Sequence, residues 1–303
     1  MWLLFAFSGP VLWAASTHID KYLLERYFKN TDTTVLMVFT ALLGLLMLPF
    51  VWLCKPEVLR IPLESICVMG ASGVLYMGAM LFYLRALQSE EASVVAPLFQ
   101  TSTLFTFVLA YFLLGETLRW TGLLGAALII LGVLSLSFNS TFRLQKFKGR
   151  LVLLMMGSTF VLALSSVIFK FYAVKDEFWA TTFWMFVGEA LFGVGILLIP
   201  RYSKQFFFLL KKNTGPLLAV NGANELINLG GGLGVRFASL LAPLVLVSAV
   251  SSTTTLFVFA FGILLSLFLP RLGREDLSRA NLIRKGIAAL IVTAGVLLAN
   301  LRA

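Results

Sequence analysis

The chain has 303 residues, of which 59% are hydrophobic and only 13% are charged, with a net charge of +10 at pH 7. Its mean hydropathy of +0.95 excludes a water-soluble domain, which has no means of burying so much apolar surface. The apolar runs are continuous and do not alternate with polar residues, so a helical bundle is expected and not a β-barrel. The 24 Lys and Arg residues lie mostly between these runs, which favours an orientation signal over a nucleic-acid partner.

Ten apolar runs predict an all-α polytopic membrane protein with ten transmembrane helices. The first run resembles a signal peptide, but no basic residue precedes it, and we expect it to remain as a span. The ninth is longer than a bilayer requires and is expected to tilt or fray near Pro270. The segment 201–214, with alternating basic residues and phenylalanines, suits a short interfacial helix or a plain loop. The runs cover residues 2–18, 33–54, 64–88, 90–114, 117–137, 150–174, 179–199, 215–237, 239–269 and 284–301.

Matches between the two halves predict an internal duplication. The stretch 16–22 aligns with 165–171 at an offset of 149 residues. Because five crossings is an odd number, a tandem copy of a five-helix unit must be inverted, as in alternating-access carriers. We therefore expect a first repeat over 1–138, a basic linker over 139–149 and a second repeat over 150–303. Other matches fall at an offset of 151 and pair Pro49 with Pro200, Gly44 with Gly195, and Arg85 with Arg236.

A family resemblance lies in the predicted helices three to five, in the stretches Ala92–Leu98, Leu114–Thr117 and Leu131–Val133. These stretches resemble the EamA family of the drug/metabolite transporter superfamily. In the second half, Ser239–Leu244 resembles the corresponding stretch, but Leu269-Pro270-Arg271 replaces the Gly-Glu pair of the first half. The resemblance implies a ten-helix carrier of small organic solutes.

Two glutamates lie centrally in apolar runs, Glu189 in the seventh and Glu225 in the eighth. A charged side chain inside a span is costly, so it indicates a functional site. Burial disfavours the charged form of a carboxyl group, and we predict that these residues couple transport to protons or bind a cationic substrate group. The alternative is a hydrogen-bonded glutamate that locks two helices together. At the offset of 151 their counterparts are Val38 and Val74, so only the second copy is expected to carry these carboxylates.

Asparagines accompany Glu225 along one helical face, which predicts a polar binding stripe toward the bundle interior. The glycine-rich stretch 230–234 follows, and we expect the backbone to unwind there and present polar groups to a ligand. The alternative is close helix packing on glycine, with the asparagines hydrogen-bonded across helices. The stripe consists of Asn221, Asn224, Glu225 and Asn228.

Further residues complete the predicted substrate site. Lys170 matches Lys21 of the first copy and is expected to attract an anionic substrate or to gate the cavity, with snorkelling to the headgroups as the alternative. Arg85 and Arg236, near helix ends, are assigned to membrane anchoring. Aromatic walls are expected from Trp13, Tyr76 and Tyr83, and polar groups from Gln100, Thr101 and Ser251.

Catalysis is disfavoured by the residue content of the spans. His18, the one histidine, has no paired metal ligand, and all four aspartates lie outside the predicted spans. We therefore predict a secondary carrier, an exporter or exchanger, that moves a small polar or amphipathic metabolite by alternating access without a metal or cofactor. The alternatives are a flippase for a lipid-linked head group and a non-transporting scaffold subunit.

The distribution of basic residues predicts an orientation. Of the 24 Lys and Arg residues, 17 lie in the regions that follow odd-numbered predicted helices. The positive-inside rule places these regions in the cytoplasm, in what we expect to be a bacterial inner membrane, with both termini outside. The family resemblance implies the opposite placement of the termini.

Overall fold

The computed structural model describes residues 1–28, 31–89, 95, 98–99, 101–117, 119–135, 149–268 and 278–300. These residues form twelve α-helices and one short 3-10 helix, and no strand occurs among them. The first half contains α1 (Trp2–Arg26), α2 (Thr33–Leu45), α3 (Leu48–Cys54), η1 (Pro56–Leu59), α4 (Leu63–Ser89), α6 (Ser102–Leu114) and α7 (Trp120–Ser135). The second half contains α8 (Gly149–Lys175), α9 (Phe178–Leu197), α10 (Pro200–Leu241), α11 (Leu244–Ser251), α12 (Thr254–Phe268) and α13 (Arg279–Asn300).

Length and composition make the chain an integral multi-pass membrane protein. Large apolar side chains such as Phe112 and Leu131 are exposed, as a surface that faces lipid requires. Within the described residues, five helical segments are long and apolar enough to cross a membrane: Trp2–Arg26, Leu63–Ser89, Val152–Lys175, Phe178–Leu197 and Leu244–Phe268. Four shorter apolar helices cover Thr33–Leu42, Ser102–Leu114, Trp120–Gly132 and Gly286–Gly295.

Glycine and proline set several helix ends. Gly115 follows α6 with a left-handed φ of +64°, a conformation that glycine adopts without steric cost. Ala242 precedes Pro243 and is extended, because proline disfavours the helical conformation of the residue before it. The chain therefore breaks between α10 and α11, and α11 restarts directly after the proline.

The segment 201–214 is helical, which excludes the plain loop, whereas the expectation that the glycine-rich stretch 230–234 unwinds was wrong. The segment 201–214 and the glycine-rich stretch 230–234 both belong to the continuous 42-residue helix α10. The backbone does not unwind, because the missing side chains are used for close packing against α1. A Cβ atom on Gly231 would lie 3.0 Å from the Trp13 indole nitrogen, and one on Gly234 would overlap the Ser8 hydroxyl. The alternative of helix packing on glycine is therefore the correct one here.

The ninth apolar run is divided in its middle. The helical path bends at Ser252 and Thr253, between α11 and α12. The Ser252 hydroxyl donates to Ala249 O at 2.6 Å and the Thr253 hydroxyl to Val250 O at 2.7 Å. Side-chain hydrogen bonds of this kind compete with the helical ladder and bend helices. Pro270 and most of the linker 139–149 lie outside the described residues.

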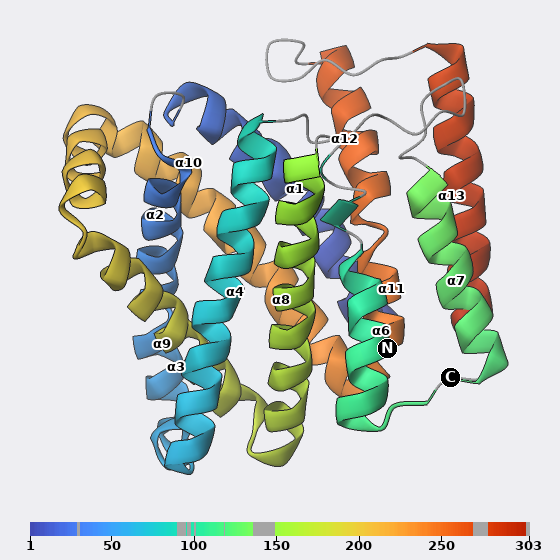
Figure 1. Cartoon of the computed structure of the whole chain (residues 1–303), viewed down its shortest axis with the longest axis horizontal. Coiled ribbons are helices and arrows are strands. Elements are labelled where there is room, and N and C mark those ends of the chain that lie inside the picture. Colours follow the sequence, from blue (N-terminus) through green and yellow to red (C-terminus); the bar gives the residue numbers. More distant parts are fainter. Residues whose placement is uncertain are drawn as a thin grey trace.

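Helices of the two halves pack across one another around the centre of the bundle. α1 lies against α10, α4 against α8 and α9, and α7 against α13 (Figure 1). α1 and α8 run in opposite directions (Figure 1). The approach of α4 to α9 is close because Gly73 faces Met185 O and Gly188 faces Gly70 O.

Candidate functional site

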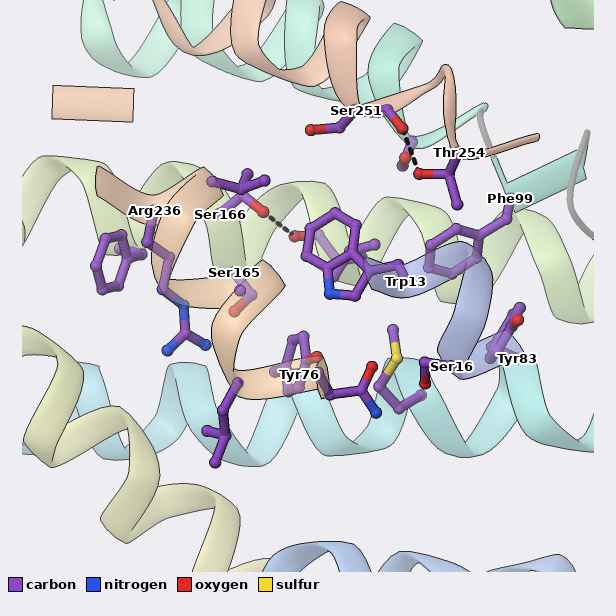
Figure 2. A pocket seen from close by; sticks show the side chains of 18 of the residues that line it. Trp13, Ser16, Tyr76, Tyr83, Phe99, Ser165, Ser166, Arg236, Ser251 and Thr254 are labelled. Atoms are coloured by element: carbon purple, nitrogen blue, oxygen red, sulfur yellow. Dashed lines mark hydrogen bonds between the residues drawn. The ribbon is translucent and has the colours of Figure 1, made fainter. Parts of the chain in front are cut away.

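A cavity of about 250 Å³ lies among helices of both halves (Figure 2). Its wall contains residues of α1, α2, α4 and α6 from the first half and of α8 to α12 from the second. The volume is near the lower end of the roughly 300–1,000 Å³ found for small-molecule pockets. A small organic molecule therefore fits the space.

The cavity wall repeats at a constant offset of 149 positions. Thirteen wall residues belong to the first half. For twelve of them, the residue 149 positions later in the chain also lines the cavity. For the two glutamates, the offset of 149 gives counterparts in the wall, whereas the offset of 151 expected from the sequence does not. Glu189 thus corresponds to Thr40, and Glu225 corresponds to Tyr76. Val74, the counterpart of Glu225 at 151, is 38% exposed and lies outside the wall. Further pairs are Ser16 with Ser165, Thr17 with Ser166, Asp20 with Phe169, and Ser102 with Ser251.

The structure brings seven of the twelve site residues proposed from the sequence into this wall. Three are aromatic, and Figure 2 shows them around the same space as Ser251. Three more come from α9 and α10, which meet at the cavity. The seven are Trp13, Tyr76, Tyr83, Glu189, Glu225, Asn228 and Ser251.

Four others lie elsewhere for identifiable reasons. Asn221 and Asn224 are 0% and 1% exposed and lie outside the cavity wall. The Thr101 hydroxyl donates to Leu98 O at 2.8 Å, one turn back in its own segment. Lys170 is not a residue of the cavity wall and forms an ion pair with Glu116 behind it. The remaining residue, Gln100, lies outside the described residues.

A charged pair crosses the cavity from α9 to α10. Arg236 Nη2 lies 3.5 Å from Glu189 Oε1 and donates a hydrogen bond to it, and the side chains are 16% and 10% exposed. Three rings surround the guanidinium, with Cζ 5.9 Å from the centroid of Tyr76, 5.2 Å from Phe169 and 5.4 Å from Phe186. Aromatic faces and a carboxylate both stabilise a cation that is removed from water. The arrangement fixes the position of the Arg236 side chain.

Two further carboxyl groups face the cavity, Asp20 from α1 and Glu225 from α10. Asp20 Oδ1 accepts a hydrogen bond from Asn224 Nδ2 at 2.7 Å, and this bond joins α1 to α10. Glu225 is 8% exposed and forms side-chain hydrogen bonds with Thr40 and Asn228. Among the described wall residues, three carboxyl groups therefore accompany one cationic side chain, Arg236.

Hydroxyl and aromatic groups cover the rest of the wall. Tyr83 OH lies 3.4 Å from the Thr17 hydroxyl, and its ring packs on Phe99 with centroids 4.8 Å apart. Trp13 lies between these rings and Ser166 in Figure 2. Polar groups thus alternate with apolar ring faces, which suits an amphipathic ligand.

Two charged residues of the cavity wall were not predicted as site residues from the sequence, Asp20 and Arg236. Asp20 was placed outside the spans, and Arg236 was assigned to anchoring. Both assignments were wrong, because α1 continues to Arg26 and α10 to Leu241, so each residue lies inside a helix and faces the cavity. For Asp20 a signal was available, since the stretch 16–22 that contains it matches 165–171 at an offset of 149.

The donor set of the cavity is suited to reversible binding. Among the described residues, no group of three or more His, Cys, Asp or Glu side chains stands close enough together to hold a metal ion. The carboxyl groups accept hydrogen bonds from amides, a hydroxyl and a guanidinium, and aromatic rings lie beside them. Such groups recognise charge and shape in a ligand without covalent chemistry.

A multi-pass helical protein with a polar cavity between its halves has the architecture of a solute transporter. The model of the EamA-like transporter family matches residues 1–138. Over these residues the match confirms the resemblance to the EamA family of the drug/metabolite transporter superfamily, whose members are transporters and not enzymes. No curated protein matches the chain.

A solved structure shares the whole fold. It is described only as the crystal structure of a protein, and it superposes with a TM-score of 0.63 at 18% sequence identity. The match covers 98% of this chain and 96% of that one, and it is one of 26 solved chains that match. At this identity the likeness concerns the fold alone.

Proposed function

We propose that this protein is a secondary carrier that moves a small polar or amphipathic organic metabolite across the membrane by alternating access. The observation that carries the proposal is the cavity wall, in which twelve residues of the first half recur 149 positions later. A cavity built from equivalent residues of two repeats is the arrangement that carriers use for their substrate.

Inverted repeats are supported by the directions of the first helices of each half. α1 and α8 run in opposite directions (Figure 1), so equivalent residues enter the cavity from opposite sides. Lys21 of α1 donates to Leu87 O near the end of α4, and Lys170 of α8 donates to Ala242 O at the end of α10. Each lysine thus binds the carbonyl end of a corresponding helix in its own half. Rocking of two such units exposes the cavity to each side in turn.

The charges of the wall favour a solute that carries an ammonium group. Arg236 is already paired with Glu189, which leaves Asp20 and Glu225 hydrogen-bonded to neutral groups. A cationic substrate group or a proton neutralises these carboxyl groups inside the membrane, where an uncompensated charge is costly. Substrate binding and proton binding at the same two residues provide a route to proton coupling. The aromatic faces beside them accommodate an apolar body.

The orientation that we propose follows the basic residues. The regions after the odd-numbered predicted helices face the cytoplasm of a bacterial inner membrane, and both termini face outward. Labelling of a cysteine introduced at each end with an impermeant reagent tests this placement. Failure of both ends to react from outside would contradict it.

The transport proposal is tested with purified protein in liposomes. Counterflow of labelled amino acids, amines, nucleosides and sugar phosphates is measured with and without a proton gradient, for the parent protein and for Glu225→Gln. We expect saturable flux of an ammonium-bearing solute, reduced about tenfold or more by the substitution because a charge-assisted contact is lost. Glu57→Gln is the matched control, because Glu57 is exposed and lies outside the cavity wall.

The variants must be shown to be folded, by their unfolding midpoints in one detergent. If the folded parent protein transports nothing in the panel, the carrier proposal for these solutes fails and a lipid-linked substrate becomes the better hypothesis. If Glu225→Gln unfolds while Glu57→Gln does not, the glutamate has a structural role between helices. Equal flux in both variants would remove Glu225 from the binding site.

A further inference from the structure

A lysine and a glutamate from different halves meet at one end of the cavity. Lys170 Nζ of α8 lies 2.5 Å from an oxygen of Glu116, the residue that follows Gly115 at the end of α6. The left-handed conformation of Gly115 ends α6 and sets the direction in which the chain leaves the helix. The two side chains are only 14% and 13% exposed, so the ion pair is largely removed from solvent.

The same two side chains hold the break between α10 and α11. Lys170 Nζ donates a hydrogen bond to Ala242 O at 2.9 Å, and Leu244 N donates one to Glu116 Oε2 at 2.8 Å. Leu244 lines the cavity, as does Ser239 in the last turn of α10. The ion pair therefore lies directly behind the cavity wall, on the side of the molecule where α6 and α8 end (Figure 1).

The equivalent lysine of the first half also has a carbonyl and a carboxylate among its partners in the described residues. Lys21 lies 149 positions before Lys170, donates to Leu87 O at 3.1 Å and lies 3.5 Å from Glu25 of its own helix. Glu25 is 67% exposed, in contrast to Glu116.

We propose that the Glu116–Lys170 ion pair is the gate that closes this end of the cavity and that it opens and re-forms in each transport cycle. The inference rests on the proposed carrier function. Glu116 belongs to the first half and Lys170 to the second, so the pair forms only when the two halves meet at this face. A buried ion pair does not separate gradually, because each charge must be either paired or hydrated. The gate accordingly has two discrete states, paired and shut or hydrated and open.

The test measures access to the cavity and does not depend on a known substrate. The reporter is Ser239→Cys in a chain whose exposed natural cysteines are replaced, Cys54→Ala and Cys67→Ala. The probe is an impermeant trimethylammonium methanethiosulfonate, whose positive charge suits the acidic cavity, added to each side of sealed proteoliposomes. Glu116→Gln and Lys170→Met each remove one charge of the gate. Glu25→Gln is the matched control, because it removes a glutamate that lies beside the equivalent lysine.

We expect both gate variants to raise the labelling rate of the reporter from the gate side by about tenfold, which corresponds to a tenfold shift of the open population. The control is expected to leave that rate unchanged. Folded gate variants with the parent's labelling rate would overturn the proposal, and so would failure of both variants to fold, since the pair would then be a fixed structural bridge. If labelling changes as expected while no solute is transported, the gate stands and the carrier proposal for the tested solutes falls.

Discussion

Gly73 in α4 offers a sharp test of how tightly the helices around the cavity are packed. A Cβ atom at this position would overlap Met185 O and would lie 2.9 Å from Glu189 N, both backbone atoms of α9. Backbone atoms cannot rotate away as a side chain does, so Gly73→Ala must push α4 and α9 apart. Gly78 lies in the same helix with nothing within 4 Å of its Cβ position, which makes Gly78→Ala the matched control.

The expected stability changes have opposite signs. Overpacking costs about 1–3 kcal/mol, and alanine is better than glycine in a helix by about 0.5–1 kcal/mol. Gly73→Ala should therefore lower the free energy of unfolding by about 1–2 kcal/mol, because the clash outweighs the gain in helix propensity. Gly78→Ala receives only the gain and should be as stable as the parent protein or slightly more stable.

The assay is thermal unfolding of the purified variants in one detergent, followed by counterflow in liposomes. Gly73→Ala is expected to have the lower midpoint and a lower flux, because movement of α9 displaces Glu189 from Arg236. Equal midpoints for the two variants would refute the reasoning, since they would show that α4 and α9 accommodate a methyl group without strain.

Two further substitutions test the charges of the cavity. Arg236→Met leaves Glu189 buried without its partner and should cost about 3–5 kcal/mol of stability. The double variant Glu189→Leu with Arg236→Met should recover most of that loss, because no buried charge is left unpaired. Unfolding midpoints compare the single and double variants, and equal midpoints would contradict a stabilising pair. Asp20→Asn should weaken binding of an ammonium-bearing solute about tenfold, because one charge-assisted contact is lost. Competition binding in detergent measures the affinity, and an unchanged affinity would place the solute away from α1.

The sequence predicted the helical class of the fold and two of the three carboxyl groups of the cavity. Glu189 and Glu225 were evident because each stands alone in the middle of an apolar run, where few functions other than binding justify its cost. Asp20 was missed because the first predicted span covers residues 2–18 and ends two positions before it. In the folded chain α1 continues past Asp20 to Arg26, since a charge near a helix end can face a polar interior as well as a headgroup.

Other features could not be read from the sequence, because one pattern serves two structures. A run of glycines permits an unwound backbone and equally permits a close helix crossing, since both depend on the missing Cβ atom. Only the position of α1 against Gly231 and Gly234 decides for the crossing. Likewise, nothing in the sequence separates a lysine that binds substrate from one that pairs with a glutamate, and Lys170 depends on Glu116, which lies 54 positions earlier in the chain.

The two halves contribute different chemical groups to the cavity wall. At the offset of 149, Thr40 stands opposite Glu189, and Tyr76 stands opposite Glu225, so equivalent positions carry a neutral group in one half and a carboxyl group in the other. Asp20 reverses the pattern, since its counterpart is Phe169. In the alternating-access mechanism that we propose, repetition of the wall provides the geometry for two alternately open states, whereas a fully symmetric wall would duplicate every charge. The residue differences between the two halves at these positions keep the repeated geometry and limit the charge that must be neutralised inside the membrane. The family match covers residues 1–138, and two of the three carboxyl groups of the wall, Glu189 and Glu225, lie beyond them.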